Sequence, residues 1–167
     1  MKKILFAAFI MLASINTNAQ QKFGHFSTAD VVPAMPEYAA AQKELQTLAE
    51  QYEADLKRMQ DEFQKKYEEY QKEQANLLEN VRQRREAELQ DLSQRIQQSV
   101  QDNQQAFQKA QSEKMQVLSE KVTAAVKKIG DEGGYVYIMD TSAGIPYIST
   151  TLSKDLTNEI KKALGIN

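Results

Sequence analysis

Residues 45–70 read LQTLAEQYEADLKRMQDEFQKKYEEY, and apolar residues recur in this stretch at steps of three and four. The steps run 3, 4, 4, 3, 4, 4 and 3, which is an eleven-residue repeat with about 3.67 residues per turn. This spacing predicts an amphipathic helix with nearly straight or slightly right-handed winding. The apolar positions are Leu45, Leu48, Tyr52, Leu56, Met59, Phe63, Tyr67 and Tyr70.

The helical pattern extends in both directions, because residues 37–129 contain neither glycine nor proline. A segment of this length is far longer than an ordinary globular helix. Pro36 suits the first turn of a helix, and Gly130 suits the position that follows the last turn. The eleven-residue spacing returns later in the segment, at Ile96, Phe107, Leu118 and Ile129, with a parallel row at Leu89, Val100 and Val122.

The apolar stripe is weakest between residues 71 and 88, near the middle of the long segment. A narrow apolar stripe on a polar helix needs a partner. We therefore expect an antiparallel helical hairpin whose tip lies at residues 76–82, with Asn80 as the N-cap of the returning helix. A single continuous helix in a rod-like coiled coil is the alternative, since no loop residue forces the reversal.

Short strand signals flank the long segment on both sides. Residues 22–27 (KFGHFS), 135–140 (YVYIMD) and 145–149 (IPYIS) predict three strands, with residues 141–144 as a hairpin connection. A final amphipathic helix is expected at residues 154–164, capped by Ser153.

The expected fold is therefore α+β and mainly α, with helical hairpin arms formed by residues 37–129 on a small β body. Residues 20–36 and 130–167 would form that body together with the C-terminal helix. Such a small sheet buries little apolar core, so we expect the bodies of several chains to combine.

Residues 1–19 (MKKILFAAFIMLASINTNA) have the three parts of a secretory signal peptide. Two lysines precede an apolar run, and small residues end the segment. Cleavage is expected between Ala19 and Gln20, which would give a soluble exported protein. Loss of Lys2 and Lys3 makes the formal net charge more negative than the −2 of the whole chain.

Composition argues against several classes of function. The chain has no cysteine and one histidine, His25, so it lacks a thiolate site and the two-histidine pattern of zinc proteases. No phosphate-binding or dinucleotide-binding glycine motif occurs, and the acidic balance argues against nucleic-acid binding. We expect neither an enzyme nor a resident cofactor or metal. The 20 glutamines are typical of long exposed helices, and we expect them to keep the outer surface soluble.

The order of these segments resembles the Skp/OmpH family of periplasmic chaperones. The resemblance covers the mature chain and is carried by KFGHFSTADVV at residues 22–32, the long charged hairpin, and SKDLTNEIKKALGI at residues 153–166. Its most specific part is KVTAAVKKIGDEGGYVYIMD at residues 121–140. The best-known members are basic, whereas this chain is acidic, so the resemblance leaves contact with membrane or lipopolysaccharide open.

The resemblance implies a homotrimer in which three β bodies join and three hairpins surround a cavity. It implies an ATP-independent holdase that keeps unfolded outer-membrane β-barrel proteins soluble for membrane assembly. A structural or adaptor coiled-coil protein of the cell envelope, acting through its hairpin tip, is the alternative function.

Two sets of residues follow from this reading. The regular spacing of the arm residues indicates mutual packing first and client contact as a second use of the same surface. The expected client-contacting residues are Leu56, Met59, Phe63, Tyr67, Tyr70, Leu89, Ile96 and Phe107. The expected core of the body or oligomer consists of Phe23, Phe26, Val136, Ile138, Ile145 and Ile148.

Overall fold

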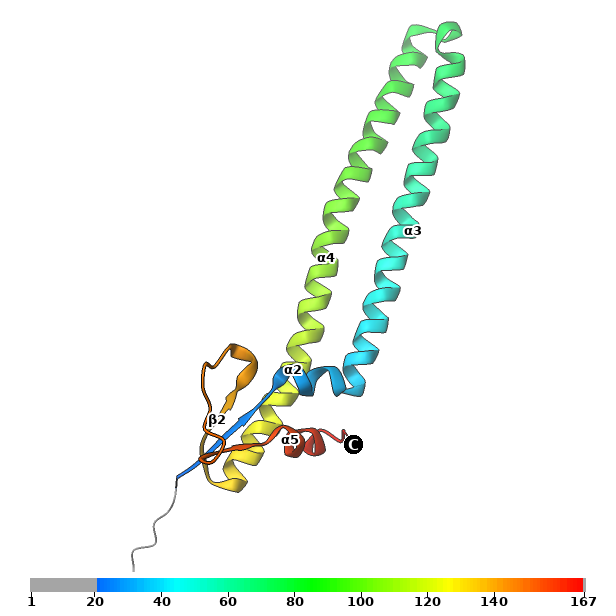
Figure 1. The fold of residues 1–167 in the computed structure, drawn as a ribbon. Coiled ribbons are helices and arrows are strands. Elements are labelled where there is room, and N and C mark those ends of the chain that lie inside the picture. The colour runs from blue at the N-terminus through cyan, green and yellow to red at the C-terminus, as the bar shows by residue number, and fades with distance from the viewer. Residues whose placement is uncertain (1–20, 167) are drawn as a thin grey trace, which may run out of the picture.

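The computed structural model describes residues 21–166, so the expected signal peptide and its cleavage site at Ala19 and Gln20 lie outside the described residues. Two long helices project from a small body that holds the strands and the C-terminal helix (Figure 1). The elements, in chain order, are β1 Lys22–Phe26, α2 Thr28–Val31, η1 Val32–Ala34, α3 Pro36–Glu73, η2 Gln74–Asn76, α4 Glu79–Gly133, β2 Tyr135–Asp140, η3 Thr141–Ala143, β3 Ser153–Asp155 and α5 Thr157–Ala163.

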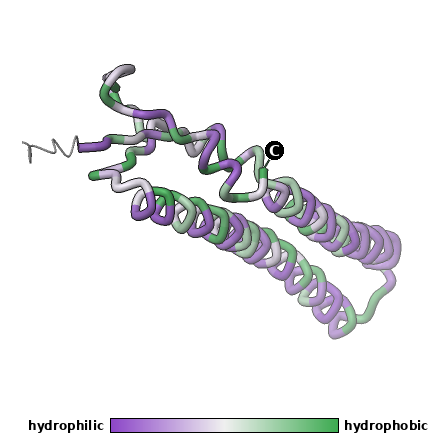
Figure 2. Tube along the Cα trace, turned by 90° about the horizontal axis from the view of Figure 1, so that it is seen from below, coloured by the Kyte–Doolittle hydropathy of each residue, from purple (hydrophilic) through white to green (hydrophobic). Residues whose placement is uncertain are grey.

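The long segment is an antiparallel hairpin, which excludes the continuous rod. Pro36 opens α3, where its missing N–H costs no helical hydrogen bond. The helix α3 has 38 residues and therefore reaches on the order of 60 Å from the body. Hydrophilic and hydrophobic residues alternate along both arms, as Figure 2 shows, because each arm has only one stripe to bury.

The reversal occupies residues 74–78, at the start of the expected tip and before it. A single 3₁₀ turn, η2, is followed by Leu77 and Leu78 in extended conformation. Asn80 is not the N-cap: Leu78 holds that position, and its carbonyl accepts from the backbone N–H groups of Val81 and Arg82. Asn80 therefore already lies inside α4.

The helix α4 is longer than expected at its other end. It continues through Gly130 to Gly133, and Gly134 is the C-cap, with a left-handed φ of 65°. This conformation suits glycine, which carries no Cβ to clash. Gly130 is therefore an interior helical residue.

The sheet has the order β2-β1-β3, and both neighbours run parallel to β1. Parallel neighbours need a crossover connection. The entire helical hairpin is the crossover between β1 and β2, so the arms leave the body and return to it within one sheet.

The expected third strand and final helix are corrected by the structure. Residues 145–149 are irregular, where Pro146 has no N–H to give to a ladder. The third strand is instead β3, at residues that we expected to begin the helix, and it pairs with β1. The helix α5 begins at Thr157, whose backbone N–H donates to Oδ1 of Asp155 at 2.9 Å. Ser153 is therefore a strand residue and not a helix cap.

One apolar core lies where the base of the arms meets the sheet and α5. Val31 and Ile160 are fully buried, and Leu156 is 1% exposed. These residues join two short helices, α2 and α5, to the base of α4, which explains how so small a body holds together. The remaining members of the core are Phe26, Val32, Met35, Leu118, Val122 and Ala125.

Candidate functional site

The interface between the arms α3 and α4, which we call the seam, has fully buried side chains at only a few positions. Ala41 and Leu45 of α3 are buried near the body, where Leu118 and Val122 of α4 are buried too. Further along the arms, Leu92 is buried at 2% exposure, while most neighbouring seam residues are half-buried. The arms therefore pack tightly at the base and more loosely beyond it.

Polar bridges join the arms at both ends of this loose region. Near the body, Lys114 pairs with Glu44. Near the tip, the Tyr70 hydroxyl donates to Oε1 of Glu86 at 2.5 Å, and the Lys66 and Glu88 side chains lie 4.0 Å apart. The bond to Glu86 raises the pKa of Tyr70, because it favours the protonated phenol.

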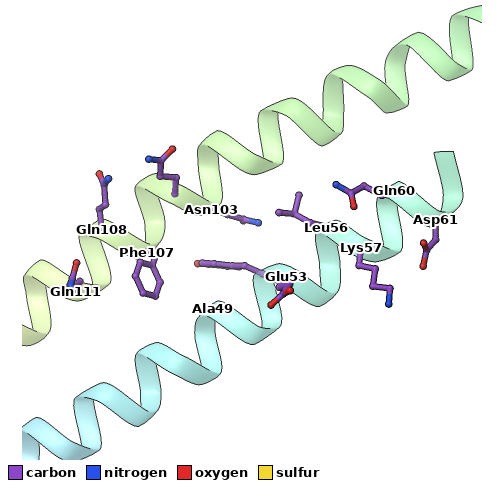
Figure 3. A pocket seen from close by; sticks show the side chains of 12 residues that line it. Ala49, Glu53, Leu56, Lys57, Gln60, Asp61, Asn103, Phe107, Gln108 and Gln111 are labelled. Carbon is purple, nitrogen blue, oxygen red and sulfur yellow. The ribbon is translucent and has the colours of Figure 1, made fainter. Parts of the chain in front are cut away.

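Between those bridges the arms enclose an open cleft of about 910 Å³. In the part of the chain that the structure describes, no ion pair joins the arms across it. Leu56 and Phe107 point toward the opposite helix, while Lys57 and Asp61 point away from it (Figure 3). The cleft thus has an apolar floor with a polar rim, and the lining is completed by Ala49, Tyr52, Glu53, Gln60, Asn103, Gln104, Gln108 and Gln111.

The expected client-contacting residues lie mostly along this seam. Leu56, Met59, Phe63, Tyr70, Leu89, Ile96 and Phe107 are half-buried. Tyr67 is more exposed, at 40%, and its ring stacks on Phe63 with the centroids 6.1 Å apart.

Leu92 is the most buried residue of the outer seam, and the sequence pattern did not indicate it, because it falls outside the eleven-residue rows. Its distance of three residues from Leu89 was the available signal. Val100, which the spacing placed in a row with Leu89, is 45% exposed.

The expected body core is only partly the core of the single chain. Phe26 is buried, and Ile138 is partly buried against the core. Val136 is 57% exposed in the single chain, so its place in the core of an oligomer stays a prediction. Val31 and Met35 are missing from the expected core, because they lie in short turns and at a helix start without a periodic pattern. Leu156 and Ile160 fall on the apolar side of the expected final helix, but that pattern did not indicate that they lie at the centre of the core.

The outer face of the sheet is apolar and open. Phe23, Ile145 and Ile148 line a cleft of about 300 Å³ together with Tyr137 and Met139. Tyr137 is 49% exposed, and Tyr147, in the loop after η3, is 79% exposed. A single chain therefore leaves a concentrated apolar surface in water.

His25 has a partner in the fold that the sequence did not indicate. Its Nδ1 lies 2.8 Å from the Ser153 hydroxyl, so the ring connects β1 to β3. Asp140, at the end of β2, accepts backbone N–H bonds from Thr28 at 3.1 Å and Ser142 at 2.9 Å. Burial opposes ionisation of this carboxyl, but these bonds outweigh it and lower its pKa. Both residues hold the body together.

The described residues 21–166 contain no cluster of three or more metal-ligating side chains. Over the same residues, no helix has the length and apolar character needed to cross a membrane.

Comparison with known proteins gives this architecture a family. A model of the family described as outer membrane protein (OmpH-like) matches residues 22–164. The chain belongs to the OmpH-like family. The matched region contains the whole hairpin and all three strands, so both arms and body of this OmpH-like chain are family features.

A solved structure has the same fold. It is a crystal structure from Caulobacter crescentus CB15, described as a candidate outer membrane chaperone (OmpH-like). The two share 15% sequence identity with a TM-score of 0.74, over 87% of this chain and 85% of that one. Among curated proteins, none matches this OmpH-like sequence.

Proposed function

We propose that this OmpH-like protein is an ATP-independent periplasmic holdase chaperone. It binds unfolded outer-membrane β-barrel proteins and keeps them soluble until membrane assembly. The observation that carries the proposal is the open cleft between the arms, in a chain that belongs to the OmpH-like family. The name of the Caulobacter crescentus relative, an outer membrane chaperone, is consistent with this role.

The arms suit weak and repeated contact with an unfolded chain. Their half-buried seam residues offer apolar surface without a closed pocket, so one client segment gains little from each contact. Many such contacts within one assembly raise the effective concentration of binding surface. Client segments of differing sequence can then be held together.

The proposed working unit is a homotrimer that joins through the body. The support is the apolar outer face of the sheet, where Tyr137 is 49%, Met139 is 45% and Leu152 is 65% exposed. Covering this face with second and third copies removes it from water, and places the three hairpins around a shared cavity. We propose export by cleavage of residues 1–19 as the route to the periplasm.

Aggregation of a urea-unfolded outer-membrane β-barrel, diluted into buffer, tests the proposal. Residues 20–167 should suppress light scattering by the client at a fixed ratio of about three chains to one client. Persistent aggregation at several-fold excess of the protein would overturn it.

A second candidate function is an adaptor that binds envelope proteins through its tip. The specific observation in its favour is Leu78, which is 73% exposed at the reversal of the chain. Leu77→Ser with Leu78→Ser should abolish an adaptor role and leave holdase activity nearly unchanged. Loss of holdase activity in that variant would assign the tip to client binding instead.

A further inference from the structure

The middle of α4 carries its glutamines in an ordered row. Six of them recur at alternating steps of three and four residues, and every one is exposed. Residues with this spacing lie along one side of a helix. We call this row the glutamine ladder, and it consists of Gln94, Gln97, Gln101, Gln104, Gln108 and Gln111.

The charged residues of the same stretch form a different row. Between residues 89 and 113, every charged side chain of α4 falls on a line with steps of 4, 7, 7 and 4. At 100° per residue this line lies about a third of a turn from the ladder. All its members are exposed: Asp91, Arg95, Asp102, Lys109 and Glu113.

The glutamine ladder borders the cleft between the arms. Gln104, Gln108 and Gln111 line that cleft, and Gln60 of α3 lies at its rim on the other arm (Figure 3). Glutamines elsewhere on the arms, such as Gln46, Gln90 and Gln116, are exposed as well, so the ladder is the part of a wider glutamine-rich surface that borders the cleft. On α4 this row joins an uncharged amide surface to the apolar floor formed by Leu56 and Phe107, whereas the α3 rim of the cleft also carries Glu53, Lys57 and Asp61.

This side matches the chemistry of an extended polypeptide main chain. A glutamine amide offers both donors and an acceptor, as the N–H and C=O groups of an unpaired backbone require. Because the ladder is uncharged, a neutral main chain can dock along this surface of α4 without removing water from ions, whereas docking on the charged line of α4 would require it. Val100 and Met115, each 40% or more exposed, flank the ladder and extend the apolar surface.

We propose that the glutamine ladder is the face of the arm that binds unfolded client. The client binds as an extended segment, with its backbone hydrogen-bonded to the glutamine amides and its apolar side chains in the cleft. This proposal rests on the proposed holdase function and adds which side of the arm acts and by what chemistry. Because the amides contact the main chain of the client, which is the same in every sequence, we expect binding with broad specificity.

Site-specific photo-crosslinking tests the assignment. A photoreactive phenylalanine analogue placed at Gln104 should crosslink a urea-unfolded outer-membrane β-barrel diluted into the sample. The same group at Asp102 or Lys109, on the charged line of the same helix, should crosslink it far less. Equal or stronger crosslinking from the charged line would overturn the ladder as the client face. Crosslinks from Gln104 to a second copy of the chain, with none to client, would show an arm-to-arm contact and also overturn it.

A charge-matched pair of variants provides a second readout. Gln97→Glu, Gln104→Glu and Gln111→Glu together should weaken client binding roughly tenfold, since amide donors are lost and the face becomes charged. Gln98→Glu, Gln105→Glu and Gln116→Glu change the formal charge equally, off the ladder, and should change binding less than about twofold. Equal effects of the two sets would contradict the proposal. If the unsubstituted protein binds no client, the holdase function itself fails, which separates the two outcomes.

Discussion

Nζ of Lys121 donates a hydrogen bond of 2.7 Å to Oε1 of Glu37, joining α4 to the first turn of α3 where the arms leave the body. The bond from Lys121 is the largest influence on the pKa of the Glu37 carboxyl and lowers it. The ion pair also places a negative charge at the N-terminus of α3, where the helix dipole favours it. The two arms are thus tied together at the point from which any opening motion would start.

Glu37→Gln should remove the ion pair with Lys121 and make the stability of the arms less dependent on pH. Since the folded pKa is depressed, the contribution of Glu37 is present above about pH 5 and is lost as the pH falls through the lowered pKa. Thermal unfolding of Glu37→Gln and of the unsubstituted protein, measured between pH 3 and 7, should converge at the acidic end. Glu62→Gln, on the exposed middle of α3, is the control and should leave the thermal midpoint at pH 7 nearly unchanged. A constant difference between Glu37→Gln and the parent at every pH would contradict the role of the ion pair.

Leu92→Ala should destabilise the hairpin more than Leu56→Ala. Leu92 is 2% exposed, so truncation leaves a cavity and costs about 2–4 kcal/mol. Leu56 borders the open cleft, where water can fill the space, so its truncation should cost about half as much or less. Urea unfolding followed by circular dichroism measures both. Equal costs would mean that the cleft is closed in solution.

Much of the hairpin could be predicted from sequence, because its signals are local. The absence of glycine and proline and the three-four spacing define both arms. The tip was misplaced by a few residues, because the reversal uses Leu77 and Leu78 instead of turn-forming residues. Gly130 suits a helix end by its sequence position, but the left-handed cap is Gly134, four residues further along the chain.

The body was harder to predict, because its contacts are non-local. Pairing of β3 with β1 joins residues about 130 positions apart, and a parallel neighbour leaves no turn signal between the strands. Leu156 and Ile160 were assigned to an amphipathic helix, yet they are the centre of the core. The glutamine ladder was visible in the sequence as regular spacing, but only the position of the cleft shows which side of the hairpin it occupies.

Gly24→Ala should destabilise the body. A Cβ at this position would lie 2.6 Å from Cδ1 of Leu156 and 3.2 Å from Cγ1 of Ile138, so the core would have to shift. Overpacking of this kind costs about 1–3 kcal/mol. Gly130→Ala is the matched control: its Cβ would meet Ile138 at 3.5 Å, an ordinary contact, and alanine favours the helix. Thermal unfolding should show a lower midpoint for Gly24→Ala and an equal or higher one for Gly130→Ala. The reverse order would contradict the packing of β1 against α5.

Tyr147→Ser should separate folding from assembly. Tyr147 is 79% exposed in the single chain, so its loss should leave the fold of the chain intact. If the apolar outer face of the sheet joins the copies, the variant should dissociate at higher protein concentration than the parent. Sedimentation velocity over a dilution series measures this. An unchanged dissociation profile would mean that the outer face is not part of the interface.

Ile160→Ala, at a fully buried position, should instead lower the free energy of unfolding by about 2–5 kcal/mol, and thermal unfolding should show a lower midpoint.

If an assembly of these chains encloses an unfolded client, the mass of the complex in solution must show it. Light scattering should be recorded for residues 20–167 alone and after dilution of a urea-unfolded outer-membrane β-barrel. We expect a mass of three chains that increases by the mass of one client, with the client remaining in solution. A monomer or dimer that leaves the client to precipitate would contradict both the assembly and the holdase function.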